Sequence, residues 1–128
     1  FKGCTALEYV KLPVHTKEIK DSAFENCVCL NMFRVRKDYY EAASLVLGKK
    51  VFKGCHSLEY VSFPEFLSKI GDNTFENCSR LTEVIVWGDG SCNSLEIGEE
   101  AFIGCKHLQR VFNTYNDQNW ETCIFRMQ

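Results

Sequence analysis

The sequence lacks the features that would direct a protein to nucleic acid or into a membrane. Its formal charge at pH 7 is only −2, from 15 basic and 17 acidic residues, so neither nucleic acid nor an anionic membrane is an expected partner. No apolar run approaches the roughly 20 residues that a membrane-spanning helix needs. The printed sequence begins at Phe1 rather than at methionine and shows no signal-peptide pattern, so we expect any targeting signal to lie outside it. We therefore expect no membrane insertion.

Arrangements of residues that would carry catalysis or bind a metal are also missing. Cys27-Val28-Cys29 has no second cysteine pair at ligand spacing, and the three histidines occupy different positions of the repeat described below. His56 follows Cys55 directly, but adjacent residues on an extended segment point to opposite sides. No acid, base and nucleophile converge elsewhere. The sequence therefore predicts no enzyme, no cofactor and no metal site.

What the sequence does contain is one motif that recurs five times with fixed internal offsets. The motif reads F-x-[G/N]-C-x-x-L-x-x-V, and Phe33 takes the valine position in the second copy. A fixed motif with a period of about 20–30 residues is typical of a solenoid. The sequence therefore predicts about five coils, which start near Phe1, Phe24, Phe52, Phe75 and Phe102.

Short and long coils alternate along the chain. The intervals between the motif phenylalanines are 23, 28, 23 and 27 residues, which suggests duplication of a two-coil block. All the variation in length lies between the valine position and an isoleucine or leucine five residues before the next phenylalanine. Insertions confined to one place in a repeat map to one face of a solenoid. The isoleucine positions hold Ile19, Leu47, Ile70 and Ile97.

A short strand is expected after the leucine of each coil, because apolar residues alternate there. Pro13 and Pro64 follow two of these runs directly, where a missing N–H ends a ladder at little cost. We expect one parallel strand per coil, with the phenylalanine, isoleucine and leucine positions facing an interior that only stacked coils can bury. The runs are Val10-Lys11-Leu12, Phe33-Arg34-Val35, Val61-Ser62-Phe63 and Val84-Ile85-Val86.

Five of the eight cysteines occupy one position of the motif. Five is an odd number, and parallel stacking points their Cβ atoms the same way, which is poor geometry for a disulfide. We therefore expect a ladder of buried thiols that donate weak S–H bonds to turn carbonyls. Cys29, Cys92 and Cys123 lie outside the motif, and a pair among them is the better disulfide candidate in an oxidising compartment. The motif cysteines are Cys4, Cys27, Cys55, Cys78 and Cys105.

The outward strand positions are the candidate binding surface, which we call the concave face. Tyrosine, tryptophan and arginine on this face are types enriched in interface hot spots. Ile85, Trp87 and Phe112 favour a protein-binding patch near coils three to five, or else they pack on the inserted loops or on further coils. The concave face comprises Tyr9, Lys11, Met32, Arg34, Arg36, Tyr60, Ser62, Glu83, Ile85, Trp87, Arg110 and Phe112.

Two runs of the sequence, residues 70–81 and 97–105, resemble the leucine-rich repeat of the BspA-like surface-protein family. They read Ile70-Gly71-Asp72-Asn73-Thr74-Phe75-Glu76-Asn77-Cys78-Ser79-Arg80-Leu81 and Ile97-Gly98-Glu99-Glu100-Ala101-Phe102-Ile103-Gly104-Cys105. The resemblance covers about residues 1–113. It implies a mainly β leucine-rich repeat solenoid, with a parallel sheet on its concave side. The longer second and fourth coils and the irregular tail depart from the family pattern.

The resemblance also implies a function in adhesion and protein binding rather than catalysis. We expect a module of an extracellular or cell-surface protein that engages a protein or extracellular-matrix ligand on the concave face. A structural spacer array with no ligand of its own is one alternative. An intracellular protein-interaction scaffold, in the cytoplasm, is another. The sequence does not indicate an oligomeric state.

We expect residues 1–128 to form a single domain, in which the repeat pattern blurs beyond Val111. Residues 114–128 are either a terminal cap, with Trp120 and Phe125 covering the last coil, or the truncated start of a further coil with Ile124 in the isoleucine position. Phe1 stands in the middle of the repeat phase. We therefore expect the chain to be a piece of a longer protein.

Overall fold

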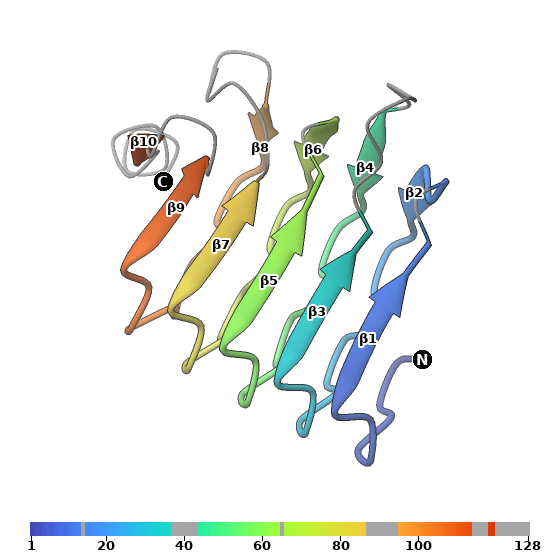
Figure 1. Ribbon diagram of the computed structural model, residues 1–128. Coiled ribbons are helices and arrows are strands. Elements are labelled where there is room, and N and C mark those ends of the chain that lie inside the picture. The colour runs from blue at the N-terminus through green and yellow to red at the C-terminus, as the bar shows by residue number, and fades with distance from the viewer. Residues whose placement is uncertain (14, 37–43, 65, 87–94, 114–117, 120–128) are drawn as a thin grey trace.

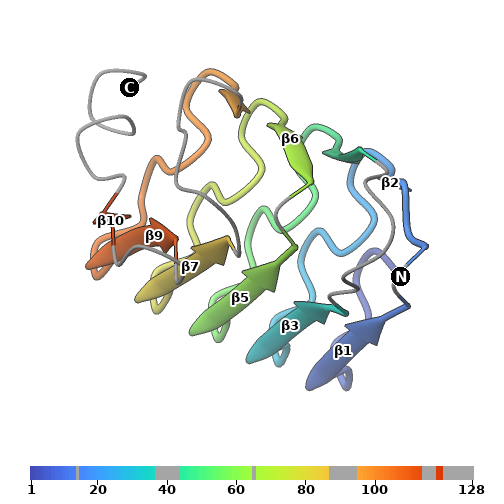
Figure 2. The same ribbon diagram turned by 45° about the horizontal axis from the view of Figure 1, so that its top comes forward.

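The coils stack in a row in the order of the sequence, from the first coil at one end of the stack to the fifth at the other (Figures 1 and 2). This computed structural model describes residues 1–13, 15–36, 44–64, 66–86, 95–113 and 118–119, with side chains up to residue 109. No helix in these ranges is long and apolar enough to cross a membrane. Two parallel sheets run the length of the stack on opposite sides of a shared core.

Each coil contributes one strand to a long parallel sheet, as the sequence predicts. Neighbouring strands pair in register, so that Val10 lies opposite Phe33 and Val61 opposite Val84. Within a strand the burial alternates: Phe33 and Val35 are buried, whereas Arg34 between them is exposed. The strands are β1 (Tyr9–Leu12), β3 (Met32–Val35), β5 (Tyr60–Phe63), β7 (Glu83–Val86) and β9 (Arg110–Asn113).

A second sheet of shorter strands lies across the core, and here the prediction of one strand per coil is wrong. This parallel sheet has four strands and is built around the isoleucine position of each coil. Its strands are only two to four residues long, so they carry too little alternation to be recognised in the sequence. They are β2 (Glu18–Ile19), β4 (Leu45–Leu47), β6 (Leu67–Ile70) and β8 (Glu96–Ile97).

At the far edge of the long sheet the parallel order ends. Strand β10 (Gln118–Asn119) pairs antiparallel with β9, with Gln118 opposite Asn113 and Asn119 opposite Phe112. The chain therefore reverses after β9 instead of adding another parallel strand in the described part. The residues on which the cap and the further-coil interpretations depend, Trp120, Ile124 and Phe125, lie outside the described residues.

The core is organised by a ladder of the five motif phenylalanines. Their rings stack nearly parallel, with centroid separations between 5.3 and 5.8 Å and interplanar angles of at most 10°. Phe33 meets this ladder edge-on, 4.7 Å from Phe52 and 5.3 Å from Phe24. Offset stacks and edge contacts are the favourable arrangements of aromatic rings. The larger Phe33 at a valine position therefore fills space between two rings of the ladder.

The motif turn is held to the next coil by backbone hydrogen bonds. Phe24 N donates to Val51 O at 2.9 Å, and Asn26 N donates to Lys53 O at 2.8 Å. The [G/N] position has a left-handed backbone in every coil, which explains why only glycine and asparagine occur there. The φ values are 74° at Gly3, 60° at Asn26, 76° at Gly54, 61° at Asn77 and 79° at Gly104.

Candidate functional site

The concave face is open to solvent in the first two coils. Tyr9 is 47% exposed, and Lys11, Arg34 and Arg36 are also exposed, while Met32 is half-buried. Lys11 and Arg34 are in-register partners on β1 and β3, and Tyr9 is the partner of Met32. Arg36 N donates to Leu12 O at 3.0 Å, which extends the ladder beyond β3. The structure thus brings the predicted residues of these two coils together on one surface.

In coils three and four the same face is more closed. Tyr60 and Glu83 are half-buried, but Ser62 is only 1% exposed and Ile85 only 7% exposed. These two residues are in-register partners on β5 and β7. Ser62 and Ile85 therefore contribute almost nothing to the accessible surface. Trp87 lies outside the described residues, and the side chains of Arg110 and Phe112 do also.

In the described part of the chain, the three exposed cations of the concave face, Lys11, Arg34 and Arg36, form no ion pair. The ion pairs found there use other lysines: Lys2 with Glu25 at 3.0 Å, Lys53 with Glu76 at 3.3 Å and Lys49 with Asp72 at 4.0 Å. Hydrogen bonding from Lys2 lowers the pKa of the Glu25 carboxyl. Those pairs tie neighbouring coils together at the turns, whereas Lys11, Arg34 and Arg36 are left for solvent or a ligand.

The motif cysteines form the expected ladder of thiols. Each later thiol donates to the carbonyl of the motif phenylalanine one coil earlier. Burial raises the pKa of the Cys55 and Cys105 thiols to about 12, and it raises the pKa of Cys78 well above its usual value. The S···O distances are 3.1 Å for Cys27 to Phe1, 3.1 Å for Cys55 to Phe24, 3.1 Å for Cys78 to Phe52 and 3.0 Å for Cys105 to Phe75.

These raised pKa values make the thiols of Cys55, Cys78 and Cys105 poor nucleophiles, since the thiolate is the reactive form. Cys55 is fully buried while His56 is exposed, so the two side chains lie on opposite sides of the turn, as the sequence predicts. Cys29 is a free, exposed thiol. Cys92 and Cys123, its candidate disulfide partners, lie outside the described residues. Among the described residues, no group of His, Cys, Asp and Glu could hold a metal ion.

Residues that the sequence reasoning missed connect one coil to the next at the short-strand sheet. Asp21 accepts a hydrogen bond from Lys49 N at 2.8 Å, and Asp72 accepts one from Glu99 N at 2.8 Å. Both aspartates stand two residues after the isoleucine position, in the first and third coils. Their recurrence at one position of the two-coil block was the signal that could have identified them.

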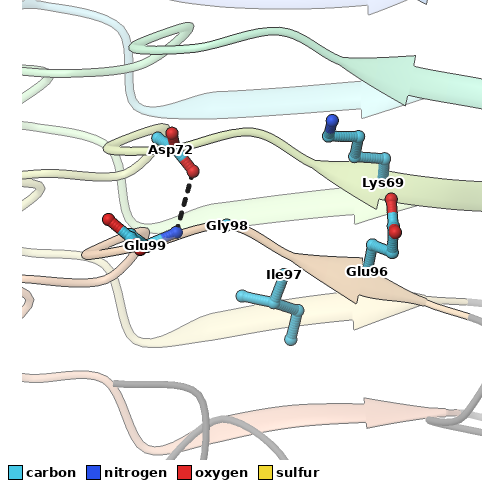
Figure 3. A pocket seen from close by; sticks show the side chains of 6 residues that line it. All are labelled: Lys69, Asp72, Glu96, Ile97, Gly98 and Glu99. Atoms are coloured by element: carbon cyan, nitrogen blue, oxygen red, sulfur yellow. Dashed lines mark hydrogen bonds between the residues drawn. The ribbon is translucent and has the colours of Figure 1, made fainter.

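A shallow depression of about 360 Å³ lies on the same side of the molecule. Figure 3 shows Asp72 aimed at the backbone of Glu99, while Lys69 and Glu96, in-register partners on β6 and β8, lie beside each other. Asp72 is therefore occupied in holding two coils together. The depression is lined by Lys69, Asp72, Glu96, Ile97, Gly98 and Glu99. With Asp72 used between coils, we take the concave face as the candidate site.

Comparison with known proteins agrees with this architecture. A search of curated protein sequences finds no significant match. Among solved structures, the crystal structure of the T. pallidum leucine rich repeat protein is similar, with a TM-score of 0.58 and 26% sequence identity. The match covers 82% of this chain and 58% of that one, so this chain spans little more than half of its structural relative.

The family comparison covers nearly the whole chain. The model of the BspA type leucine rich repeat region matches residues 1–109 and 43–127 and comprises six copies, against the five coils that the sequence predicts. The parallel sheets, the stacked phenylalanines and the turn motif are what such a repeat produces when it is stacked. The chain belongs to the BspA-type leucine-rich repeat family.

Proposed function

We propose that this chain is a non-enzymatic protein-binding module of a surface or secreted protein, and that its ligand engages the concave face. The observation that carries the proposal is a division of roles within each strand. Inward positions are apolar and pack in the core, whereas outward positions differ between coils and, in β1 and β3, are largely exposed. Side chains that support no core and vary along one sheet are available for recognition.

The family supports the general part of this proposal. Leucine-rich repeat domains are interaction modules, and solenoids present extended surfaces that suit protein partners. The types on the exposed part of the face, Tyr9 and Arg34 among them, are enriched in interface hot spots. The resemblance to surface proteins supports adhesion to a protein or matrix ligand outside the cell as part of this proposal.

Affinity capture with a pair of matched variants tests the proposal. The sheet variant carries Tyr9→Ala, Met32→Ala and Arg34→Ala, and the control variant carries Lys17→Ala, Glu18→Ala and Lys69→Ala outside the concave face. We expect a partner that the wild-type chain captures from host or culture material to be kept by the control and lost by the sheet variant, while both variants remain folded. Retention by the sheet variant contradicts the concave face, and absence of any partner favours a spacer.

The compartment is tested separately by thiol counting under denaturing, non-reducing conditions. A secreted module is expected to show a disulfide among the three cysteines outside the motif, Cys29, Cys92 and Cys123. Eight free thiols in protein isolated from its native source favour an intracellular scaffold instead.

A further inference from the structure

Among the concave-face residues whose side chains the structure describes, the cations lie together at one end of the sheet. Lys11 on β1 and Arg34 on β3 are in-register partners, so their side chains leave neighbouring strands about 4.8 Å apart. Arg36 lies two residues beyond Arg34 on the same face, about 6.6 Å along the strand. All three are exposed. The carboxylate placed on this face, Glu83, belongs to β7, two strands away from β3.

As far as the described residues show, this arrangement of cations is unfavourable for the fold. Like charges directly opposite each other on neighbouring strands repel and lower stability. In the described part of the chain, no carboxylate forms an ion pair with these three residues. A carboxylate group placed between Lys11 and Arg34 would relieve the repulsion, and an arginine can hold it through two parallel hydrogen bonds.

An apolar row runs beside the cations. Tyr9, Met32 and Tyr60 are in-register partners across β1, β3 and β5. They are exposed or half-buried. A ligand that covers both rows therefore needs acidic groups next to apolar or aromatic ones. Polypeptides offer that combination in adjacent residues, whereas a sulfated polysaccharide offers charge with little apolar surface.

We propose that the first three coils of the concave face bind an acidic polypeptide segment, with carboxylates on Lys11, Arg34 and Arg36 of the first two coils and apolar side chains on Tyr9, Met32 and Tyr60. The proposal rests on the proposed function, since it takes the concave face as the binding surface. It adds the chemical class of the partner and its place on the sheet. Coils three and four, where Ser62 and Ile85 are buried, offer no such charge.

Fluorescence anisotropy with two synthetic peptides tests the proposal on the whole chain. One labelled peptide has six Glu-Tyr repeats, and its neutral counterpart has six Gln-Tyr repeats. We expect the acidic peptide to bind at least tenfold more tightly than the neutral one, and its affinity to fall as salt rises. Lys11→Gln with Arg34→Gln should weaken binding at least tenfold. The control Lys17→Gln with Lys20→Gln changes the net charge equally and should leave binding unchanged.

A urea titration of each variant tests whether a loss of peptide binding is due to unfolding. Because Lys11 and Arg34 repel each other, the Lys11→Gln, Arg34→Gln variant should keep the urea midpoint of the wild type or raise it. A midpoint well below that of the wild type would show that the two cations support the fold, and would overturn the argument that they are free for a ligand.

The outcomes separate this inference from the proposed function. Equal binding of both peptides that is lost in Tyr9→Ala, Tyr60→Ala overturns the acidic partner but keeps the concave face. Tight binding of heparin with no binding of the acidic peptide overturns the polypeptide in favour of a polysaccharide. If no substitution on the concave face alters binding of either peptide, both proposals fail.

Discussion

At the scale of single residues, two kinds of side-chain contact between neighbouring coils alternate with the two-coil block. Asn26 in the second coil places its Oδ1 where a Cβ at Gly54 of the third coil would lie, and Asn77 does the same to Gly104. Between the first and second coils and between the third and fourth, the contact is made by Asp21 and by an aspartate at the equivalent position. These contacts between coils therefore recur every second coil, as the coil lengths do.

Replacing Gly54 by alanine tests this contact. The backbone at Gly54 is left-handed, which costs any residue with a Cβ about 1–2 kcal/mol. The Cβ would also collide with the Asn26 side chain. Gly54→Ala should therefore destabilise the protein by about 1–2 kcal/mol more than Gly3→Ala, where nothing lies within 4 Å of the new Cβ. In an Asn26→Gly background the difference should vanish. Urea unfolding of Gly54→Ala and Gly3→Ala, each with and without Asn26→Gly, measures this difference in unfolding free energy. A difference that persists without Asn26 contradicts the contact.

Because burial raises the pKa of motif thiols such as Cys55, the unfolding free energy should fall as the pH rises above 9. The pKa of Cys55 is 9.0 when the chain is unfolded and about 12 when it is folded. Below pH 9 the thiol is neutral in both states and contributes no pH dependence. Between pH 9 and 12 only the unfolded state loses the proton, so each such thiol lowers the unfolding free energy by up to about 1.4 kcal/mol per pH unit.

Removing one buried thiol should therefore flatten the alkaline loss of stability. We expect the unfolding free energy of Cys55→Ala, which is lower than that of the wild type at pH 7 because of the cavity, to fall less steeply between pH 9 and pH 10.5. Urea unfolding at several pH values measures the slope for the wild type and for Cys55→Ala, and identical slopes for the two proteins would contradict the raised pKa.

At the scale of elements, the short-strand sheet requires glycine because its coils approach closely. A Cβ at Gly71 would lie 2.5 Å from the carbonyl carbon of Gly48 and 2.9 Å from Lys49 N. These are backbone atoms that cannot move aside singly. The first coil has Lys20 at the equivalent position, where it is exposed and no earlier coil in the described structure packs against it.

We therefore predict that Gly71→Ala destabilises the protein by about 2–4 kcal/mol, because β6 must move away from β4. Lys20→Ala, at the same position of the first coil, should change stability by less than about 0.5 kcal/mol. Thermal unfolding followed by circular dichroism compares the two. Similar midpoints for Gly71→Ala and the wild type would show that the coils are not packed as closely as described.

The repeat made the long sheet and the thiol ladder predictable from the sequence. Alternating apolar residues such as Phe33 and Val35 show which side of a strand faces the core. A cysteine at the same motif position in every coil implies that each of these thiols has a similar environment. The short-strand sheet was not predictable, since two residues such as Glu18 and Ile19 carry no period. The burial of Ile85 on the outward face was equally hidden, because alternation gives the direction of a side chain but not what lies above it.

At the scale of the whole molecule, structure and recognition use different positions of the same strands. The inward positions and the turns build a stack whose coils depend on their neighbours, because no coil buries its phenylalanine alone. The outward positions can vary without disturbing that stack. One solenoid can thus be adapted to a ligand by changing side chains along a single face, and the first two coils carry the exposed set in this chain.

The most direct test of this account measures stability and binding on the same set of variants. Inward substitutions are Phe33→Ala and Val61→Ala, and outward substitutions are Tyr9→Ala and Arg34→Ala. We expect each inward substitution to lower the unfolding free energy by about 2–5 kcal/mol. Each outward substitution should change the unfolding free energy by less than about 1 kcal/mol and weaken binding of the captured partner at least tenfold. Outward substitutions that unfold the protein, or that leave binding intact, would contradict it.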